Sequence, residues 1–249
     1  MFNDFLSGLT YFFKGIRMIF HPGLRRFVII PLIINIVMFT AAILVGIDQF
    51  DTLLDWLMPQ GEAWWIEFAR VILWILFSAM ISLIVFFTFT LIANLLGAPF
   101  NGLLSEKVEC SLSGEIHEEE GGVRLLLASI FPSLLSEARK MAYFLIIAAV
   151  VLILSLFIHV LSPLLWGIFA SWMFALEYIA YPMENHGIYF SKTRAKVRKK
   201  RAISFGFGMA VMFATMIPLV NFLVMPSAVT GATILWVERL NRTAGKEIE

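Results

Sequence analysis

The segment His21-Pro22-Gly23-Leu24-Arg25-Arg26 places the residue types of an anion site directly before an uncharged run, residues 27–47. Pro and Gly break a preceding helix, and Pro is tolerated in a first helical turn. We therefore expect a new helix to begin near Gly23, with its first N–H groups unpaired by the backbone. Those donors, together with the positive end of the helix dipole, attract anions.

Arg25 and Arg26 add two guanidinium groups to this helix start. A guanidinium is planar and permanently charged, and its forked donors suit a tetrahedral oxyanion. The sequence therefore predicts an anion site formed by Gly23, Leu24, Arg25 and Arg26 at the mouth of a membrane segment. The alternative interpretation is that the two arginines only anchor that segment on its cytoplasmic side.

The composition is that of an integral membrane protein. Of the 249 residues, 60% are hydrophobic and 15% are charged, and the mean hydropathy is +0.86. A soluble chain of this length would carry far more charge. The single cysteine, Cys110, excludes an internal disulfide and a thiol metal cluster. We expect no metal, no other cofactor and no nucleic-acid partner.

Residues 1–20 predict an amphipathic helix that lies in the membrane interface. Their apolar side chains recur at helical spacing, while the polar ones fall mostly on the other side. A helix that binds a partner protein is the alternative interpretation.

Two full transmembrane helices are predicted, over residues 23–47 and 64–96. The run 27–47 has no charge and is long enough to cross a core of roughly 30 Å. The run 71–105 is also uncharged, and its breakers at 97–102 predict a helix end near Leu96. The loop Asp48–Glu67 is acidic and lacks Lys and Arg, so the positive-inside rule places it outside and both termini in the cytoplasm.

Two further segments are predicted to be cytoplasmic. Residues 106–140 are charged and should be helical in pieces around Gly114 and 121–122. His117 and the three glutamates after it could suggest a metal site, but no second ligand cluster stands at a suitable spacing, and a solvated acidic turn is favoured. Residues 177–201 end in seven Lys or Arg residues, a pattern typical of contact with anionic lipids.

Two uncharged runs, 141–176 and 202–237, are each 36 residues long. The first is interrupted by His159, Ser162 and Pro163, and the second by Pro218, Asn221 and Pro226. Because the flanks of both are basic, we expect hairpins whose arms of about 16 residues, roughly 24 Å, only partly penetrate the bilayer. Broken backbone at that depth must be buried in protein or line a wet cavity, as in a permeation pathway. Two ordinary kinked helical pairs are the alternative.

Polar residues near membrane depth are candidates for such a pathway. They are Asn35, Asn94, Asn101 and Asn221, with Glu106 at the cytoplasmic end. Amides donate hydrogen bonds to an anion without trapping it. Hydrogen bonding between helices is the alternative role for each of them. Ser227 and Gly231, four residues apart, instead predict close helix packing.

Four motifs in this order resemble those of the CysZ family of bacterial sulfate permeases. They are Gly-Leu-Arg-Arg-Phe-Val-Ile-Ile-Pro at 23–31, Ala-Pro-Phe-Asn-Gly-Leu-Leu at 98–104, Tyr-Pro-Met-Glu-Asn-His at 181–186, and Ile-Pro-Leu-Val-Asn through Met-Pro at 217–226. The resemblance implies an inner-membrane oligomer that admits sulfate for cysteine synthesis. It also implies an all-helical fold of two spans plus hairpins that partly enter the bilayer, with sulfate contacts at Gly23, Leu24, Arg25 and Arg26.

Other functional classes find little support in the motifs. The chain has no Gly-rich nucleotide loop, Gly-x-Ser-x-Gly elbow or His-Glu-x-x-His pair, so we expect no enzyme. An enzyme would need a dispersed site, such as His159 or His186 with Glu177 and Glu184. A non-transporting partner of another membrane complex is a third possibility.

The chain has no nucleotide site, so we expect facilitated passage of the anion, with proton-coupled transport as the runner-up. The candidate proton-carrying groups for such coupling are Glu106, Glu109, Glu177, Glu184, Glu238 and His159.

Overall fold

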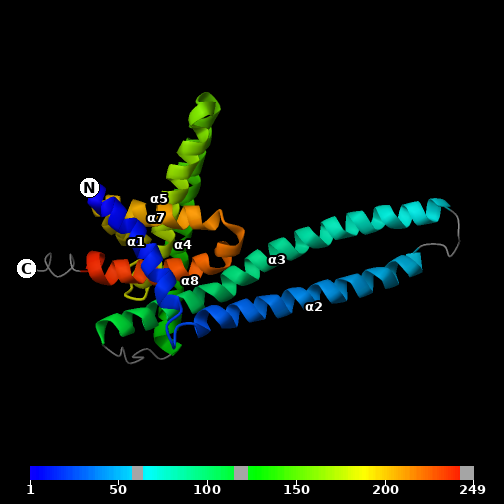
Figure 1. The fold of residues 1–249 in the computed structure, drawn as a ribbon, viewed down its shortest axis with the longest axis horizontal. Coiled ribbons are helices and arrows are strands. Elements are labelled where there is room, and N and C mark those ends of the chain that lie inside the picture. Colours follow the sequence, from blue (N-terminus) through cyan, green and yellow to red (C-terminus); the bar gives the residue numbers. More distant parts are fainter. Residues whose placement is uncertain (58–63, 115–122, 242–249) are drawn as a thin grey trace, which may run out of the picture. The chain divides into compact units, whose positions relative to one another are not determined.

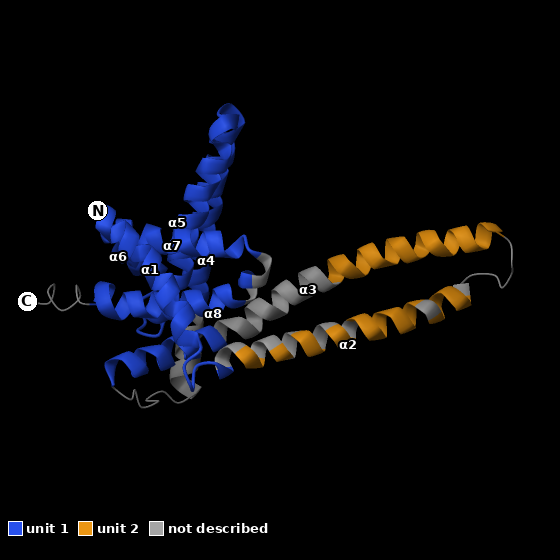
Figure 2. Ribbon diagram, viewed as in Figure 1, with its two compact units in different colours: residues 1–28, 100–249 blue, residues 29–99 orange. Residues whose placement is uncertain are grey.

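The computed structural model describes residues 1–57, 64–114 and 123–241. In some helical stretches within these ranges, chiefly 85–99 and 123–131, it describes only the backbone. All regular structure in these ranges is helical, as predicted (Figure 1). The chain divides into two compact units (Figure 2). Unit 1 comprises residues 1–28 and 100–249, and unit 2 comprises residues 29–99.

Unit 2 is formed by most of α2 (Arg26–Leu57) and the first part of α3 (Trp64–Ser113), which run alongside each other (Figure 1). Phe50 of α2 stacks on Phe77 of α3, with ring centroids 3.5 Å apart. Near the end of the pair, Arg70 donates to Asp55 at 3.0 Å. Residues 64–84 of α3 are long and apolar enough to cross a membrane.

Both helices of unit 2 are longer than predicted. The predicted start of the loop Asp48–Glu67 is wrong, because α2 continues to Leu57. Asp48, Asp51 and Asp55 recur at helical spacing, and Leu54 is buried, so the helix continues with one polar and one packed side. Residues 58–63 lie outside the described part.

The predicted end of α3 near Leu96 is also wrong, because the helix runs through residues 97–102 to Ser113. Leu104, Ser105 and Val108 are buried in unit 1, and this packing outweighs the weak helix propensity of the preceding Gly and Pro residues. The helix then ends where expected, before Gly114, whose φ of 71° is in the left-handed region. The segment His117–Glu120 lies outside the described residues.

In unit 1, α4 (Val123–Phe157) and α5 (Ser162–Glu184) form a hairpin joined by the 3₁₀ turn His159–Leu161. The break falls at the predicted position. The arms are longer than the predicted 16 residues, since α4 extends back beyond Lys140 and α5 continues beyond Glu177. Residues 132–157 and 159–184 are each long and apolar enough to cross a membrane.

An ion cluster around the buried ammonium of Lys140 explains why α4 and α5 continue past charged residues. The Lys140 ammonium lies 2.8 Å from a carboxylate oxygen of Glu137 and 2.8 Å from one of Glu177. Lys140 itself is only 6% exposed. Paired charges can be buried where single ones cannot, so both helices continue through them.

The second hairpin has the short arms that were predicted. It consists of α7 (Arg201–Thr215) and α8 (Pro218–Leu235), of 15 and 18 residues, or roughly 22–27 Å. The break lies at residues 216–217, and Pro218 opens α8, a position that proline tolerates. The predicted interruption at Pro226 is wrong, because Pro226 remains inside α8, where its neighbours Val224 and Ser227 are buried.

Helix α1 (Phe2–Ile19) packs along α7 and α8. Gly15 lies so close to the backbone of Ser227 and Gly231 that a Cβ would not fit there. The prediction that Ser227 and Gly231 allow close helix packing is therefore confirmed. Other apolar residues of α1, Phe2, Leu6 and Phe13, remain exposed, as does Phe20 directly after the helix. The remaining elements of unit 1 are α6 (Phe190–Lys199) and a π-helical turn, Trp236–Leu240.

Candidate anion site

The predicted site lies on the turn between α1 and α2. The N–H groups of Leu24 and Arg25 both donate to the carbonyl of His21, at 3.1 and 3.4 Å. Gly23 has a φ of 95°, which favours glycine and interrupts the right-handed helix. As a result α2 begins at Arg26, three residues later than predicted, and the N–H groups of Leu24 and Arg25 are already paired. The first turn of α2 supplies the unpaired N–H groups instead.

The four predicted residues have different surroundings. Leu24 is 5% exposed and belongs to the core of unit 1, so it fixes the turn to the body of this unit. Arg25 and Arg26 are exposed. The turn is therefore anchored by one apolar side chain and presents two guanidinium groups beside it.

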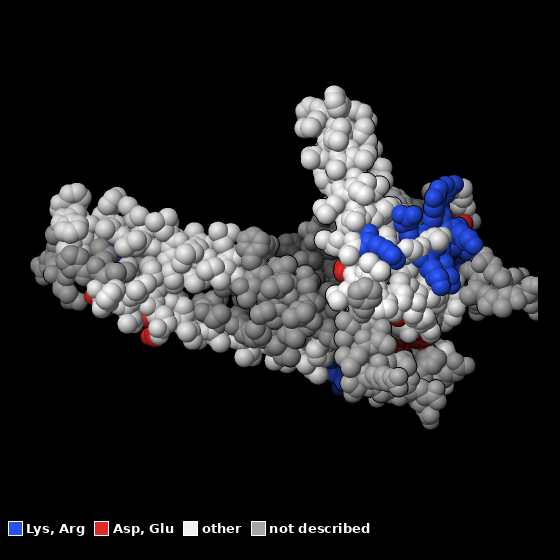
Figure 3. All heavy atoms as spheres, turned by 180° about the vertical axis from the view of Figure 1, so that it is seen from behind, with Lys and Arg blue, Asp and Glu red and all other residues white. Residues whose placement is uncertain are grey.

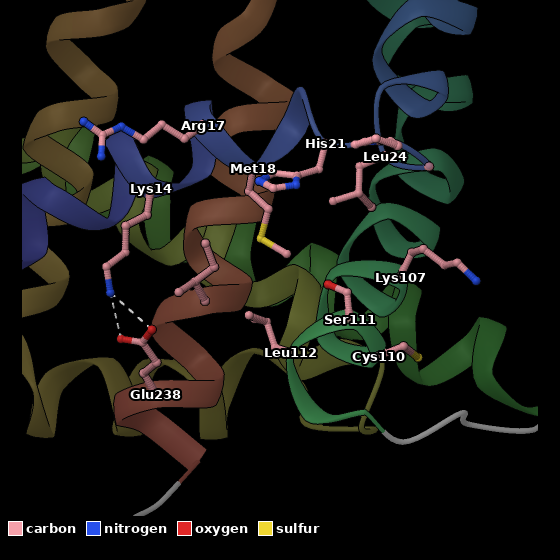
Figure 4. A pocket seen from close by; sticks show the side chains of 13 residues that line it. Lys14, Arg17, Met18, His21, Leu24, Lys107, Cys110, Ser111, Leu112 and Glu238 are labelled. Carbon is pink, nitrogen blue, oxygen red and sulfur yellow. Dashed lines mark hydrogen bonds and ion pairs between the residues drawn. The ribbon is translucent and has the colours of Figure 1, made fainter.

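A cavity of about 780 Å³ opens beside this turn (Figure 4). Its lining combines α1, the turn, the last part of α3 and the chain around α8. The residues are Lys14, Arg17, Met18, His21, Pro22, Gly23, Leu24, Lys107, Cys110, Ser111, Leu112, Ile234 and Glu238. Gly23 and Leu24 are thus part of a cavity wall, whereas Arg25 and Arg26 are not among its lining residues.

Within the cavity, the carboxylate of Glu238 is bound by two donors. Lys14 donates to it at 2.9 and 3.2 Å, and the Tyr11 hydroxyl donates at 2.8 Å. Burial raises the pKa of Glu238, but the hydrogen bonds from Lys14 and Tyr11 outweigh it, so the pKa lies below its usual value. Lys14 and Glu238 neutralise each other, and Figure 4 shows the side chains of Arg17 and Lys107 extending away from the middle of the cavity. Both side chains are exposed, so the positive charge of this cavity lies at its rim.

Sequence reasoning missed Lys14, Arg17 and Lys107 as cavity residues. Lys14 and Arg17 could have been recognised, because they are three residues apart on the polar side of α1 and precede the His21 turn by less than two helical turns. Lys107 lies far away in the sequence, and only the unpredicted extension of α3 brings it here.

The predicted pathway residues are not gathered at this cavity. Asn101 is buried on α3, and its side-chain amide donates to the Tyr181 hydroxyl at 3.4 Å. Glu106 is half-buried, and Asn221 is exposed on α8. Asn35 lies on α2 and Asn94 on α3, but their side chains fall outside the described residues.

A second polar contact connects the end of α3 with the segment after α5. The Nε2 atom of His186 lies 2.9 and 3.0 Å from the carboxylate oxygens of Glu109, which is buried. Beside it, the Asn185 amide donates to the Gly102 carbonyl at 3.0 Å. The hydrogen bond to Glu109 raises the pKa of His186 above its usual value, against an opposing effect of burial.

This pair should make stability depend on pH. A raised pKa in the folded state means that protonated His186 stabilises the fold below its unfolded pKa of about 6.5. The contribution is lost as the pH rises through the higher folded pKa. We expect wild-type protein in detergent to have a higher unfolding temperature than His186→Gln at pH 6, and the difference to shrink by pH 9. A difference that is constant over this range would contradict the assignment.

Helices that are long and apolar enough to span a membrane are those of a helical membrane protein, and the cavity beside the Gly23 turn has cations at its rim. Residues 11–226 match the family described as "Sulfate transporter CysZ/Etoposide-induced protein 2.4". The chain belongs to this family, which confirms the resemblance seen in the sequence motifs.

Relatives match almost end to end. The sulfate transporter CysZ of Pseudomonas aeruginosa is 43% identical over 234 residues, which cover 93% of this chain and 95% of that protein. The sulfate transporter CysZ of Vibrio cholerae is 38% identical over 237 residues, covering 93% of each. That of Pectobacterium atrosepticum is 38% identical over 238 residues, covering 94% of this chain and 85% of its own length.

Proposed function

We propose that this protein is a sulfate permease that supplies cysteine biosynthesis by facilitated passage of sulfate. The observation that carries the proposal is the cationic cavity beside the Gly23–Arg26 turn, in a chain whose relatives are named sulfate transporters. The role is transport rather than catalysis.

The cavity and the turn act on the anion in different ways. Arg17 and Lys107 raise the local concentration of a divalent anion by their charge. Arg25 and Arg26 then bind it beside the first turn of α2, where guanidinium and N–H donors replace part of its hydration shell. Asn35, Asn94, Asn101, Asn221 and Glu106 are kept as proposed polar residues of the pathway.

The proposed location is the bacterial inner membrane, with both termini in the cytoplasm and the acidic stretch Asp48–Glu67 outside. The basic-residue distribution supports this orientation. The hairpin ends are apolar and exposed in unit 1, with Phe157 at 81% and Val160 at 92% exposed in the first. Such ends favour contact with lipid or a second copy of the chain over water, which supports a homo-oligomer. Partial penetration is proposed for the α7–α8 hairpin, whose arms have 15 and 18 residues, because the arms of α4–α5 are long enough to cross a membrane.

Sulfate entry must overcome the membrane potential. An inside-negative potential opposes each negative charge by about 2.3 kcal/mol per 100 mV, or about 4.6 kcal/mol for sulfate. Consumption of sulfate in the cytoplasm can maintain the inward gradient that a passive pathway requires. Co-entry of protons is the alternative energy source.

Flux measurements in sealed vesicles test both parts of the proposal. Vesicles containing purified protein should take up labelled sulfate faster than protein-free vesicles, down a sulfate gradient. With equal sulfate on both sides, an inward proton gradient should cause no net accumulation. Absence of protein-dependent flux would reject the permease, whereas accumulation abolished by an uncoupler would replace passive passage with proton coupling.

A further inference from the structure

A second concave site lies on unit 1, and it shares no lining residue with the anion cavity. It has a volume of about 340 Å³ and is formed by α1, the junction of α6 with α7, and the π-helical turn. Its lining residues include Met1 and Asp4 of the N-terminal segment and Ala202 and Ile203 of α7. Figure 3 shows Lys and Arg side chains gathered in one patch on a face of this unit.

The chemistry of this pocket is that of a phosphate site. Four side-chain cations, Lys199, Lys200, Arg201 and Arg239, line the pocket together with one carboxylate, Asp4, which pairs with the N-terminal ammonium of Met1 at 3.1 Å. The first turn of α7, at Arg201–Ile203, adds N–H groups that have no partner within the helix. Guanidinium and ammonium groups of α6, α7 and the π-helical turn line one pocket, and such groups bind phosphate oxygens through charged hydrogen bonds.

Other cations of the basic segment have different roles. Arg194 lies over the Tyr143 ring, 5.0 Å from its centroid, and Lys196 lies over the Trp236 ring at 4.6 Å. These contacts hold α6 against the rest of unit 1. The end of α6 and the start of α7 therefore form the part of the segment that is arranged around a cavity.

The pocket has an apolar border on α1. Met1 lines it, and Met1 and Phe2 are 78% and 72% exposed, with Leu6 also exposed one turn further along the helix. A free anion would gain nothing from these side chains. A phospholipid would use both parts, because its phosphate binds the cations and its acyl chains cover the apolar residues.

We propose that this pocket binds the phosphate of an anionic phospholipid and thereby holds α1 and the α6–α7 junction against the membrane surface. This site is separate from sulfate passage. Full-length protein in detergent is titrated with short-chain phosphatidylglycerol, with phosphatidylcholine of the same chain length, and with inorganic phosphate. Bound lipid is counted by native mass spectrometry.

We expect phosphatidylglycerol to bind, and Lys200→Gln/Arg201→Gln to weaken its binding at least tenfold. The matched control, Lys192→Gln/Arg198→Gln, removes two charges from the same basic segment outside the pocket and should bind like wild type. Phe2→Ser/Leu6→Ser should weaken phosphatidylglycerol binding but leave phosphate binding unchanged. Equal loss in the test and control pairs would overturn the proposal, since general surface charge would then explain binding.

A further variant covers the case in which the charge-removal pair does not fold. Ala202→Glu places a carboxylate in the first turn of α7, where it favours the helix but repels a phosphate. It should fold and lose phosphatidylglycerol binding. Normal binding by this variant, or a pocket that takes inorganic phosphate and phosphatidylglycerol equally well, would reject the phospholipid site.

Discussion

Replacing both Arg25 and Arg26 by alanine should weaken sulfate binding at least tenfold while the protein remains folded and inserted in the membrane. Hydrogen bonds to charged groups contribute about 1.5–3 kcal/mol each, and a tenfold change in affinity corresponds to about 1.4 kcal/mol. We expect a loss near tenfold rather than a much larger one, because both side chains are exposed and water replaces part of their interaction with sulfate. The measurement is isothermal titration of purified protein with sulfate, accompanied by a thermal unfolding curve.

Two comparisons make this result specific. Lys192→Ala/Arg198→Ala removes the same charge from α6 and should leave sulfate affinity unchanged. Arg17→Ala/Lys107→Ala removes the cations of the cavity, and should slow sulfate entry at low salt more than it changes affinity. An unchanged affinity for sulfate in Arg25→Ala/Arg26→Ala would instead indicate that these arginines only anchor the membrane segment.

The sequence was most informative where one local rule decides the structure. Gly23 and the uncharged run after it predicted a chain break followed by a helix, and the break at His159–Ser162 followed from residues that disturb an apolar helix. The spacing of Ser227 and Gly231 predicted a close helix contact, since small residues let two backbones approach.

Sequence reasoning failed where contacts with residues far away in the sequence override a local pattern. The glycines and proline before residue 103 suggested a helix end, yet packing of Leu104 and Val108 in unit 1 carries α3 onward. Lys140 and Glu177 were treated as the ends of a hairpin, but each is the partner of the other. For the same reason Lys107 and Glu238 could not be assigned to the anion cavity, because no local pattern relates them to the Gly23 turn.

Removing both carboxylate partners of Lys140 should cause the largest loss of stability. Glu137→Gln/Glu177→Gln leaves a buried ammonium without the two oxygens that now lie 2.8 Å from it. Breaking a fully buried pair while one charge remains costs about 3–5 kcal/mol. The side chains of Glu137 and Glu177 are 53% and 33% exposed, so we expect the lower end, about 3 kcal/mol. The expected result is a loss of this size in the free energy of unfolding, measured by denaturant titration in mixed micelles.

A third substitution separates charge from packing in this cluster. Adding Lys140→Met to the double variant removes the stranded charge and keeps an apolar side chain of similar length, so most of the stability should return. The exposed pair Lys14–Glu238 serves as the comparison, and Lys14→Met should cost less than about 1 kcal/mol. If the triple variant is no more stable than the double variant, the unpaired charge of Lys140 does not cause the loss of stability. The continuity of α4 and α5 past Lys140 and Glu177 would then depend on apolar packing between the two helices instead.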